Sequence, residues 1–314
     1  MSTTTAKTAS YPRQRHLSDR SIINLFVWPT LVLLILMNVF PLFYSLYLSF
    51  TNYSAIAGKA PVWIGFQNFA NLLNDQQMWK YFATTGKYAL VSVGLQTLFG
   101  FGLAMLVHEK FKGSGLVTTL ILIPMMISPV VVGLFWKLMY NPTFGYFNYL
   151  IGFTNPIKGP DMLASSFARH GVPGLALSAV VLVDVWMWTP FVMLLVLSGL
   201  KAIPDYLYEA AAIDRASSWF QFWRITVPQV TPLLLIAILF RTIEAFKSFD
   251  LVMGMTGGGP GDQTELIAVN LYRQAFLGQW QTGRSSALAY IILIIIIAVS
   301  NLYILYLNRM RGEA

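Results

Sequence analysis

Long apolar stretches constrain this chain most, because each can cross the hydrocarbon layer of a membrane as a helix. A spanning helix needs about 20 mostly apolar residues. Charged residues make up only 11% of the chain, against about 25% in an average soluble protein, and the mean hydropathy is +0.61. We therefore predict an all-α, polytopic membrane protein with six transmembrane helices. The predicted spans are residues 22–50, 83–107, 116–139, 175–200, a fifth from about 230 onward, and 287–307.

The distribution of basic residues predicts how the chain sits in the membrane. Residues 1–21 form a basic, Ser/Thr-rich tail, and the apolar stretch after them is too long for the core of a signal peptide. Lys and Arg also gather in the turn 108–114, in the segment 201–232 and in the tail 308–314, and the opposite side carries fewer. By the positive-inside rule, both termini and the segment 201–232 are predicted to be cytoplasmic.

Several functional classes are disfavoured by composition. The net charge of +8 comes from basic residues scattered at the ends of apolar stretches, without the basic stripe that nucleic-acid binding needs. The chain has no cysteine, which excludes disulfides, thiolate metal sites and a cysteine nucleophile. Its histidines, His16, His108 and His170, are far apart, so we expect no metal site.

The segment 201–232, KAIPDYLYEAAAIDRASSWFQFWRITVPQVTP, is a polar and aromatic island between two apolar stretches. Pro204 suits the first position of a helix because it has no N–H to lose, and Asp205 favours the positive end of the helix dipole. Two short helices joined by a turn would form a compact knob on the membrane face. The predicted elements are a helix over 204–213, a turn over 214–218, and a second helix over 219–225 bounded by Pro228 and Pro232.

This segment resembles the EAA cytoplasmic loop of ABC-importer permeases. The residues that match are Glu209, Ala210, Ala211, Asp214, Ala216, Phe222, Ile225 and Pro228. Two positions depart from the family pattern, since Arg215 stands where the family has glycine and Val227 where it has leucine. In that family the loop is the coupling helix that docks on an ATPase subunit. The alternative is an ordinary interfacial amphipathic helix. The resemblance implies that Glu209, Ala210, Ala211, Asp214, Arg215, Ala216 and Pro228 couple this chain to an ATPase.

Three further motifs narrow the resemblance to the carbohydrate branch of these permeases, the maltose and glycerol-phosphate type. They are Trp63 to Phe69, the sequence NPTFGYFN that opens the loop 140–174, and the glycine run 257–261 within TGGGP. The glycine run is predicted to be a tight external loop and not a phosphate-binding loop, because no Gly-Lys-Ser/Thr follows it.

The resemblance also implies an assembly. It predicts a permease domain over residues 22–307, a second permease that is a different but related chain, two ABC ATPase subunits and an extracytoplasmic solute-binding protein. ATP and Mg²⁺ would be bound by the ATPase subunits, and no cofactor by this chain. The expected location is the bacterial inner membrane and the expected cargo a sugar-like solute.

Charged residues in the fifth span are the second informative feature. Arg241, Glu244, Lys247 and Asp250 recur every third residue, so neighbours along the helix can pair as ions. A charge that faces lipid at mid-membrane costs about 2.5 to 3.5 kcal/mol on insertion scales, so these side chains should face the bundle interior or a watery cavity. Asp184 in the fourth span is another, and the expected partners are Lys201 or Lys247. Two interpretations remain open, an ion-pair ladder that holds helices together or part of a transport path.

The resemblance to maltose-importer permeases places a substrate path on the helices before and after the EAA-like loop. Spacing from Pro190 and Phe249 supplies the alignment. Trp188 and Phe191 lie three apart, so they are expected to share one helix face. The residues predicted for the path are Met187, Trp188, Phe191, Arg241, Glu244, Ser248 and Asp250.

Two other functional classes compete with the permease. A secondary transporter would also place charges at mid-membrane, but the halves of the chain show no internal repeat. A membrane-embedded enzyme would need an acid and base pair, and Asp184 and Glu244 are carboxylates that no motif frames. We therefore predict a transport subunit with no catalytic residue of its own.

Overall fold

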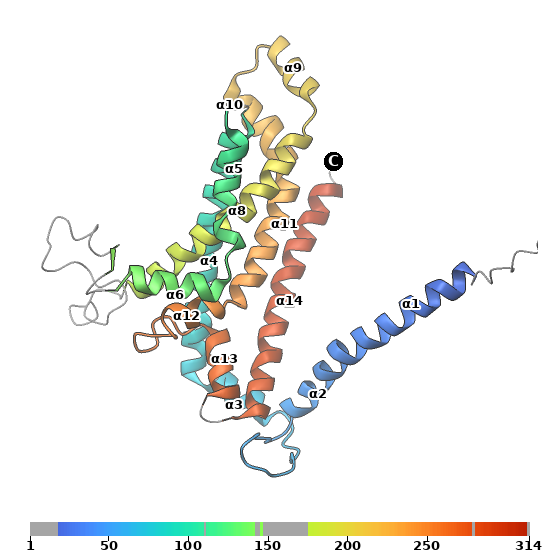
Figure 1. Cartoon of the computed structure of the whole chain (residues 1–314), viewed down its shortest axis with the longest axis vertical. Helices are drawn as coiled ribbons and strands as arrows, with labels where there is room; N and C mark the ends of the chain where they lie inside the picture. The colour runs from blue at the N-terminus through green and yellow to red at the C-terminus, as the bar shows by residue number, and fades with distance from the viewer. Residues whose placement is uncertain (1–17, 110, 142–144, 147–174, 278–279, 313–314) are drawn as a thin grey trace, which may run out of the picture.

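The computed structural model describes residues 18–109, 111–141, 145–146, 175–277 and 280–312, and in these ranges the chain is almost entirely helical (Figure 1). Five helices are long and apolar enough to cross a membrane, and a bent pair makes a sixth if it is one span. The prediction of an all-α, polytopic membrane protein is confirmed. In chain order the helices are α1 (Asp19–Leu34), η1 (Ile35–Val39), α2 (Phe40–Ser49), α3 (Gln67–Asn74), α4 (Gln76–His108), α5 (Ser114–Leu122), η2 (Pro124–Met126), α6 (Pro129–Met139), α8 (Ala176–Ala202), α9 (Asp205–Ile213), α10 (Ser218–Gln221), η5 (Phe222–Thr226), α11 (Val227–Phe246), α12 (Asp250–Met255), α13 (Ile267–Phe276) and α14 (Thr282–Gly312).

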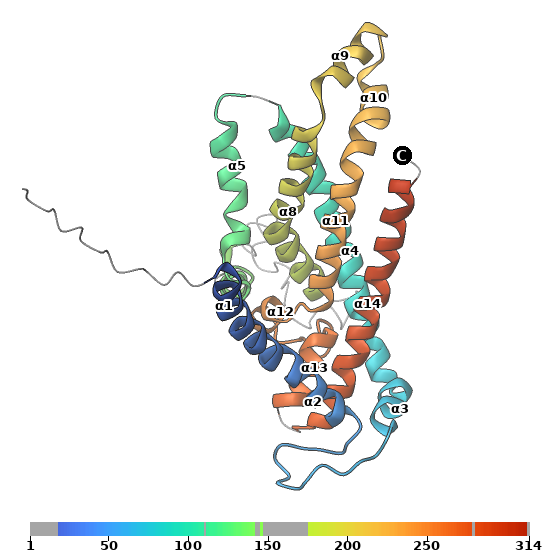
Figure 2. The ribbon, with the colours of Figure 1, turned by 90° about the vertical axis from the view of Figure 1, so that its right-hand side faces the viewer.

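Helices α4, α8 and α11 form the centre of the bundle, and α14 packs beside α11 (Figures 1 and 2). Helix α8 is the most deeply buried, with 67% of its apolar window inside the protein. Close approach to α4 depends on Gly100, because a Cβ there would lie 2.7 Å from the Cβ of Val192. Small residues at such crossings let membrane helices pack backbone to backbone.

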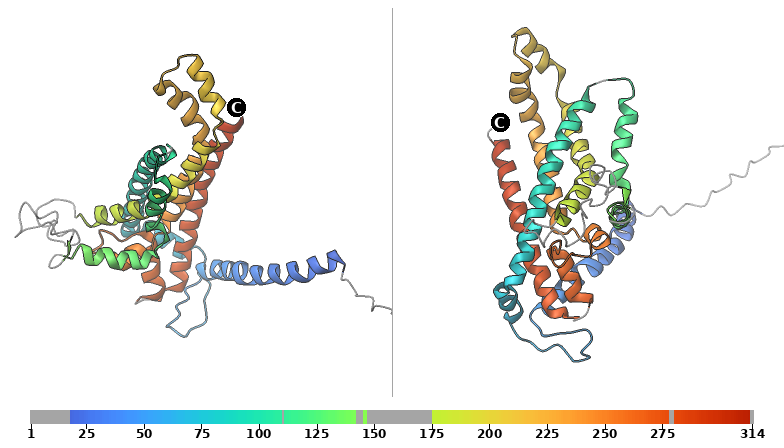
Figure 3. Two further views of the ribbon diagram at one scale, coloured as in Figure 1. Left: turned by 45° about the horizontal axis from the view of Figure 1, so that its top comes forward. Right: turned by 90° about the vertical axis from the view of Figure 1, so that its left-hand side faces the viewer.

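Helix α1 leans away from this bundle and contrasts with the rest (Figures 1 and 3). Every residue from 23 to 44 is exposed, although residues 23–49 form one continuous apolar span. Helix α2 packs against α14, and near the start of α2 the Tyr290 hydroxyl donates to the Leu42 carbonyl at 2.5 Å. A helix that is apolar all round must be covered by lipid or by other helices.

The third span is bent, which corrects the single helix expected over residues 116–139. Residues 114–126 and 129–139 meet at 94°. Ile127 and Ser128 are extended, with ψ of 141° and 134°. The residue before a proline avoids the helical region, so Pro129 explains the break at Ser128. Most of the loop 140–174, including residues 142–144 and 147–148 of the NPTFGYFN motif, lies outside the described residues.

The fifth span begins earlier than expected. Residues 218–246 form one continuous helical run, so Pro228 and Pro232 lie within a helix and do not end one, which corrects the prediction. Pro228 is at the start of α11, directly after the π-helical turn η5. The wider turn accommodates the ring, which would otherwise clash with the carbonyl four residues earlier.

Candidate functional site

A polar cavity of about 90 Å³ opens where α8, α11 and the start of α12 meet. Asp184 and Lys247 are among the residues that line it. Helix α11 ends at Phe246 and a new helix starts at Asp250, so the four regularly spaced charges do not share one helix, which corrects the single helix expected for them. Of the predicted substrate path, the structure brings Trp188, Arg241, Glu244, Ser248 and Asp250 to this cavity.

Two residues of the predicted path lie elsewhere. Met187 is 1% exposed and belongs to the apolar cluster around Tyr88 and Val183. Phe191 packs against a second cluster that contains Val192. Neither lines the polar cavity. Trp188 and Phe191 therefore do not present one aromatic wall to it.

The charged centre of the site is a buried ion pair between α8 and α11. Arg241 Nη2 lies 3.2 Å from Asp184 Oδ2, and both side chains are 3% exposed. The partner of Asp184 is therefore Arg241. The sequence analysis expected Lys201 or Lys247 instead, and the structure corrects that expectation. Since Arg241 pairs across helices, it does not pair with Glu244 along its own.

Gln96 of α4 completes this pair as a three-helix network. Its Nε2 donates to Asp184 Oδ2 at 2.8 Å, and its Oε1 accepts from Arg241 Nε at 2.8 Å. The amide thus satisfies an acceptor and a donor that the ion pair leaves open, as buried polar groups require. Sequence reasoning missed Gln96, which the structure buries fully, although a glutamine within an apolar span was a visible signal.

The network sets the position of Trp188 at the cavity. The guanidinium carbon of Arg241 lies 4.6 Å from the centre of the Trp188 ring. A desolvated cation over an indole face is attracted by about 2 kcal/mol. Because Arg241 is itself fixed by Asp184 and Gln96, the ring has a defined orientation.

The outer part of the cavity is more open. Lys247 Nζ lies 2.8 Å from Glu244 Oε1, and the two side chains are 52% and 54% exposed. The predicted pairing of these two neighbours is confirmed. Ser248 shares a 3.1 Å hydrogen bond with the hydroxyl of Tyr88, a second residue that the sequence did not single out. The cavity therefore offers a carboxylate, an ammonium, hydroxyls and an aromatic face, which suit a solute with several hydroxyls.

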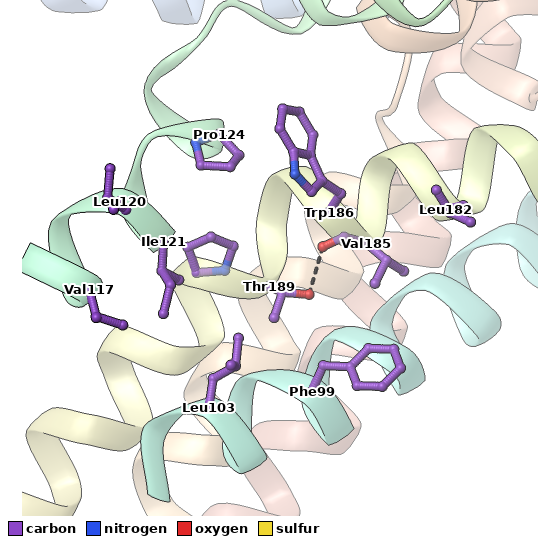
Figure 4. A pocket seen from close by; sticks show the side chains of 11 residues that line it. Phe99, Leu103, Val117, Leu120, Ile121, Pro124, Leu182, Val185, Trp186 and Thr189 are labelled. Atoms are coloured by element: carbon purple, nitrogen blue, oxygen red, sulfur yellow. Dashed lines mark hydrogen bonds between the residues drawn. The ribbon is translucent and has the colours of Figure 1, made fainter. Parts of the chain in front are cut away.

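The other face of α8 lines a different pocket, of about 560 Å³, between α4, α5 and α8 (Figure 4). Trp186 and Pro124 lie at its edge, and its wall is apolar. Thr189 does not change this, because its hydroxyl already donates to the Val185 carbonyl at 2.6 Å. This pocket has almost nothing with which to recognise a polar solute.

At one end of the molecule, α9 and α10 form the predicted knob. The expected helix over 204–213 is confirmed as α9. Ser217 caps α10 by accepting from the Phe220 N–H at 3.3 Å, and the Tyr208 hydroxyl is 2.8 Å from Thr226 Oγ1. The contact between Tyr208 and Thr226 joins α9 to the helical run that follows. Of the predicted coupling residues, Glu209, Ala210, Asp214, Arg215 and Pro228 are exposed, Ala216 is half-buried and Ala211 is buried.

A groove of about 730 Å³ follows the turn of the knob. It is lined by Leu207 and Phe220 on its apolar side and by Asp214, Arg215 and Ser217 on its polar side. The coupling residues Ala210, Ala211 and Ala216 also border it.

The glycine run 257–261 is a loop at the opposite end, as predicted. Glu265 is 1% exposed behind it and pairs with Arg273 at 3.1 Å. Burial raises the pKa of the Glu265 carboxyl, and the Arg273 charge opposes that shift. Gly258, at φ +92°, lies against both side chains, so that a Cβ there would clash with Glu265. In the described ranges, no group of three or more His, Asp or Glu side chains could hold a metal ion.

Comparison with known proteins shows which family the chain is similar to. A family model described as "Binding-protein-dependent transport system inner membrane component" matches residues 96–311. The trehalose/maltose transport system permease protein MalF of Thermococcus litoralis is 32% identical over 289 residues, which cover 92% of this chain and 94% of that protein. The sulfoquinovosyl glycerol transport system permease protein SmoG of Agrobacterium fabrum is 30% identical, over 94% of this chain and 92% of that protein.

A solved structure agrees with the fold. A chain from the crystal structure of a bacterial ABC transporter involved in the import of the acidic polysaccharide alginate matches with a TM-score of 0.77. The match covers 92% of this chain and 96% of that one, at 20% sequence identity. At this identity the likeness concerns the fold alone.

Proposed function

Because the chain belongs to the family of binding-protein-dependent transport system inner membrane components, we propose that it moves a sugar or sugar-like solute into the cytoplasm by alternating access. It is a transmembrane permease of an ABC importer. The proposal adds how this chain works: separate ATPase subunits hydrolyse ATP, and α9 carries their motion to the polar cavity. The domain bounds 22–307 stay a prediction.

The observation that carries the proposal is the continuous helix from the knob to the cavity. Residues 218–246 run without a break, which at 1.5 Å per residue is a rod of roughly 40 Å. At Thr226 it is joined to α9 by the contact with the Tyr208 hydroxyl, and its last turns carry Arg241 and Glu244 into the cavity wall. A rigid element that touches both sites can bias both, which is what mechanical coupling requires.

The cavity chemistry supports a hydroxylated solute. Trp188 offers an aromatic face, and Glu244, Lys247 and Ser248 offer acceptors and donors. Relatives named for trehalose, maltose and sulfoquinovosyl glycerol transport agree with this class. A cavity of about 90 Å³ is smaller than a disaccharide, so in the proposal this chain supplies one wall and the partner permease another.

The exposed helix α1 supports a second permease. Residues 23–44 are all exposed within this chain, and a single knob cannot fill both grooves of an ATPase dimer. We propose a heterodimer with a related permease, two ABC ATPase subunits that bind ATP and Mg²⁺, and an extracytoplasmic solute-binding protein that delivers the solute. No cofactor is assigned to this chain.

The orientation in the bacterial inner membrane follows from the same parts. In the proposal the α9 end is cytoplasmic, because an ATPase must reach it and because Lys and Arg gather there. The end of α14 lies toward the same end of the bundle (Figure 2), and the N-terminal tail belongs on that side too.

The test is a charge reversal at Glu209, which is exposed on α9. We expect Glu209→Lys to insert normally, to abolish uptake and to leave ATP hydrolysis unresponsive to solute. The matched control is Lys112→Glu, in the exposed turn between α4 and α5 at the same end of the bundle, which should transport normally. Full uptake by Glu209→Lys would refute the coupling role.

A further inference from the structure

Arg215 adopts a backbone conformation that arginine disfavours. Its φ is +54°, and Trp280 is the other non-glycine residue with positive φ in the described ranges. The Ala216 N–H donates to the Ala211 carbonyl at 2.9 Å, and the Arg215 N–H donates to the Ala212 carbonyl at 3.1 Å. This pair of bonds is a Schellman motif, which ends α9 and needs a left-handed residue at position 215. Glycine adopts that conformation freely, whereas a residue with a Cβ is strained in it.

Nothing within the described chain compensates the strain. The Arg215 side chain is exposed, and its guanidinium makes no hydrogen bond or ion pair with any described residue. Its neighbour Asp214 is exposed as well and forms no pair with it. An outlier of this kind at a surface turn points to a role outside the chain.

The groove in which Arg215 lies limits what can meet it. Its lining combines the apolar side chains of Leu207 and Phe220 with the polar side chains of Asp214, Arg215 and Ser217. Helix α9 projects beyond the ends of α5 and α14 (Figures 1 and 2), so the turn that follows α9 lies at one tip of the described chain, where another protein can reach it. A planar guanidinium with five donors matches a carboxylate, which accepts two parallel hydrogen bonds.

We propose that Arg215 binds an acidic side chain of the ATPase subunit, which enters the groove between α9 and α10. This inference rests on the proposed function and adds the chemistry of the contact. The Arg215 side chain is exposed and makes no bond within the described chain, so docking breaks no existing contact of the guanidinium. Compared with glycine at position 215, arginine makes the free permease less stable and makes the permease bind the ATPase subunit more tightly.

The experiment compares Arg215→Gly, Arg215→Asn and Arg215→Lys in the permease pair reconstituted in nanodiscs. Asparagine tolerates the left-handed conformation without the charge, and lysine keeps the charge with the strain. We expect Gly and Asn to raise the melting temperature of the permease and to weaken binding of the ATPase subunit about 10- to 100-fold, the loss of one charge-assisted contact. Lysine should retain part of the affinity, and Lys112→Gln should change neither quantity.

Salt and lipid give two more readouts. Raising the ionic strength should weaken ATPase binding by the wild type more than by Arg215→Gly. Salt screens the proposed ion pair of Arg215, and the glycine variant no longer has that pair. Equal ATPase affinity for wild type and Arg215→Gly would overturn the inference. An effect of Arg215→Gly on melting temperature that appears only in nanodiscs with phosphatidylglycerol would also overturn it, in favour of a lipid phosphate. If the ATPase binds neither the wild type nor any of the variants, the proposed function fails instead.

Discussion

Two ion pairs, about one helical turn apart along α11, behave differently because one is buried and the other is not. Arg241 and Asp184 are 3.2 Å apart and 3% exposed, whereas Lys247 and Glu244 are 2.8 Å apart and more than half exposed. The shorter pair is the weaker contributor to stability, since water screens it. Breaking the buried pair leaves a charge in a place that water does not reach. Distance alone therefore does not rank them.

The difference also separates their roles at the cavity. Arg241 is held by Asp184 and Gln96 and lies over Trp188, so it acts as a positioning residue for the aromatic face. Glu244 and Lys247 have free surface on the cavity, so they are available to a solute. Near the end of α11 a buried pair and an exposed pair thus lie about one turn apart, and only the exposed one is proposed to meet the solute.

The largest effect is expected from Asp184→Ala. It leaves the buried Arg241 guanidinium without its counter-charge, which costs about 3 to 5 kcal/mol, so the variant should melt far earlier than wild type or fail to accumulate. The measurement is thermal unfolding of the detergent-solubilised permease pair. The control is the double variant Asp184→Leu with Arg241→Met, which removes both charges and should recover much of the stability. A single variant as stable as wild type would show that water reaches this pair.

A smaller loss is expected from Gln96→Leu, which keeps both charges but removes the amide between them. Arg241 Nε and Asp184 Oδ2 each lose a 2.8 Å hydrogen bond, at a cost of about 1 to 3 kcal/mol. The control is Gln77→Leu, which removes the more exposed contact of that residue with Asp262 and should change the melting temperature little. Equal shifts for the two glutamines would contradict a buried network.

The network also shows where sequence reasoning stopped. Spans and the helix over 204–213 could be predicted, because apolar length and helix-start residues are local signals. The partner of Arg241 could not, since a spacing of three favours a local pair with Glu244, whereas Asp184 lies 57 positions away. Which faces of two helices meet depends on packing, which spacing within one helix does not report.

In the segment 201–232 the sequence indicated a helix end that the structure does not have. Pro228 and Pro232 suggested a helix end, but the π-helical turn before Pro228 lets the helix continue. That continuity, not visible in the sequence, connects the knob to the cavity. The turn after α9 could be predicted from the family pattern, whereas the strain at Arg215 required the backbone angle.

The two tryptophans of α8 sharpen the comparison between polar and apolar surroundings. We expect Trp188→Ala to lower uptake about 10-fold, from loss of a contact of about 1 to 2 kcal/mol with Arg241 and of the aromatic face. Trp186→Ala, in the apolar pocket, is the matched control and should retain most of the uptake. The measurement is solute uptake together with solute-stimulated ATP hydrolysis in correctly inserted variants. The reverse order would place the solute on the other face of α8.

The smallest effect on stability is expected from Glu244→Gln. The pair with Lys247 is exposed, and such pairs contribute about 0 to 1 kcal/mol, so the melting temperature should change by a few degrees at most, and this change should shrink further at high salt. Uptake should fall nonetheless, because the amide replaces a carboxylate acceptor at the cavity. Lys247→Gln tests whether the ammonium or the pair is needed: if only the pair matters, both variants and the double variant lose the same uptake. A melting shift as large as that of Asp184→Ala would mean that the partner permease covers Glu244 in the assembly, and the distinction between the two pairs would then hold for this chain alone.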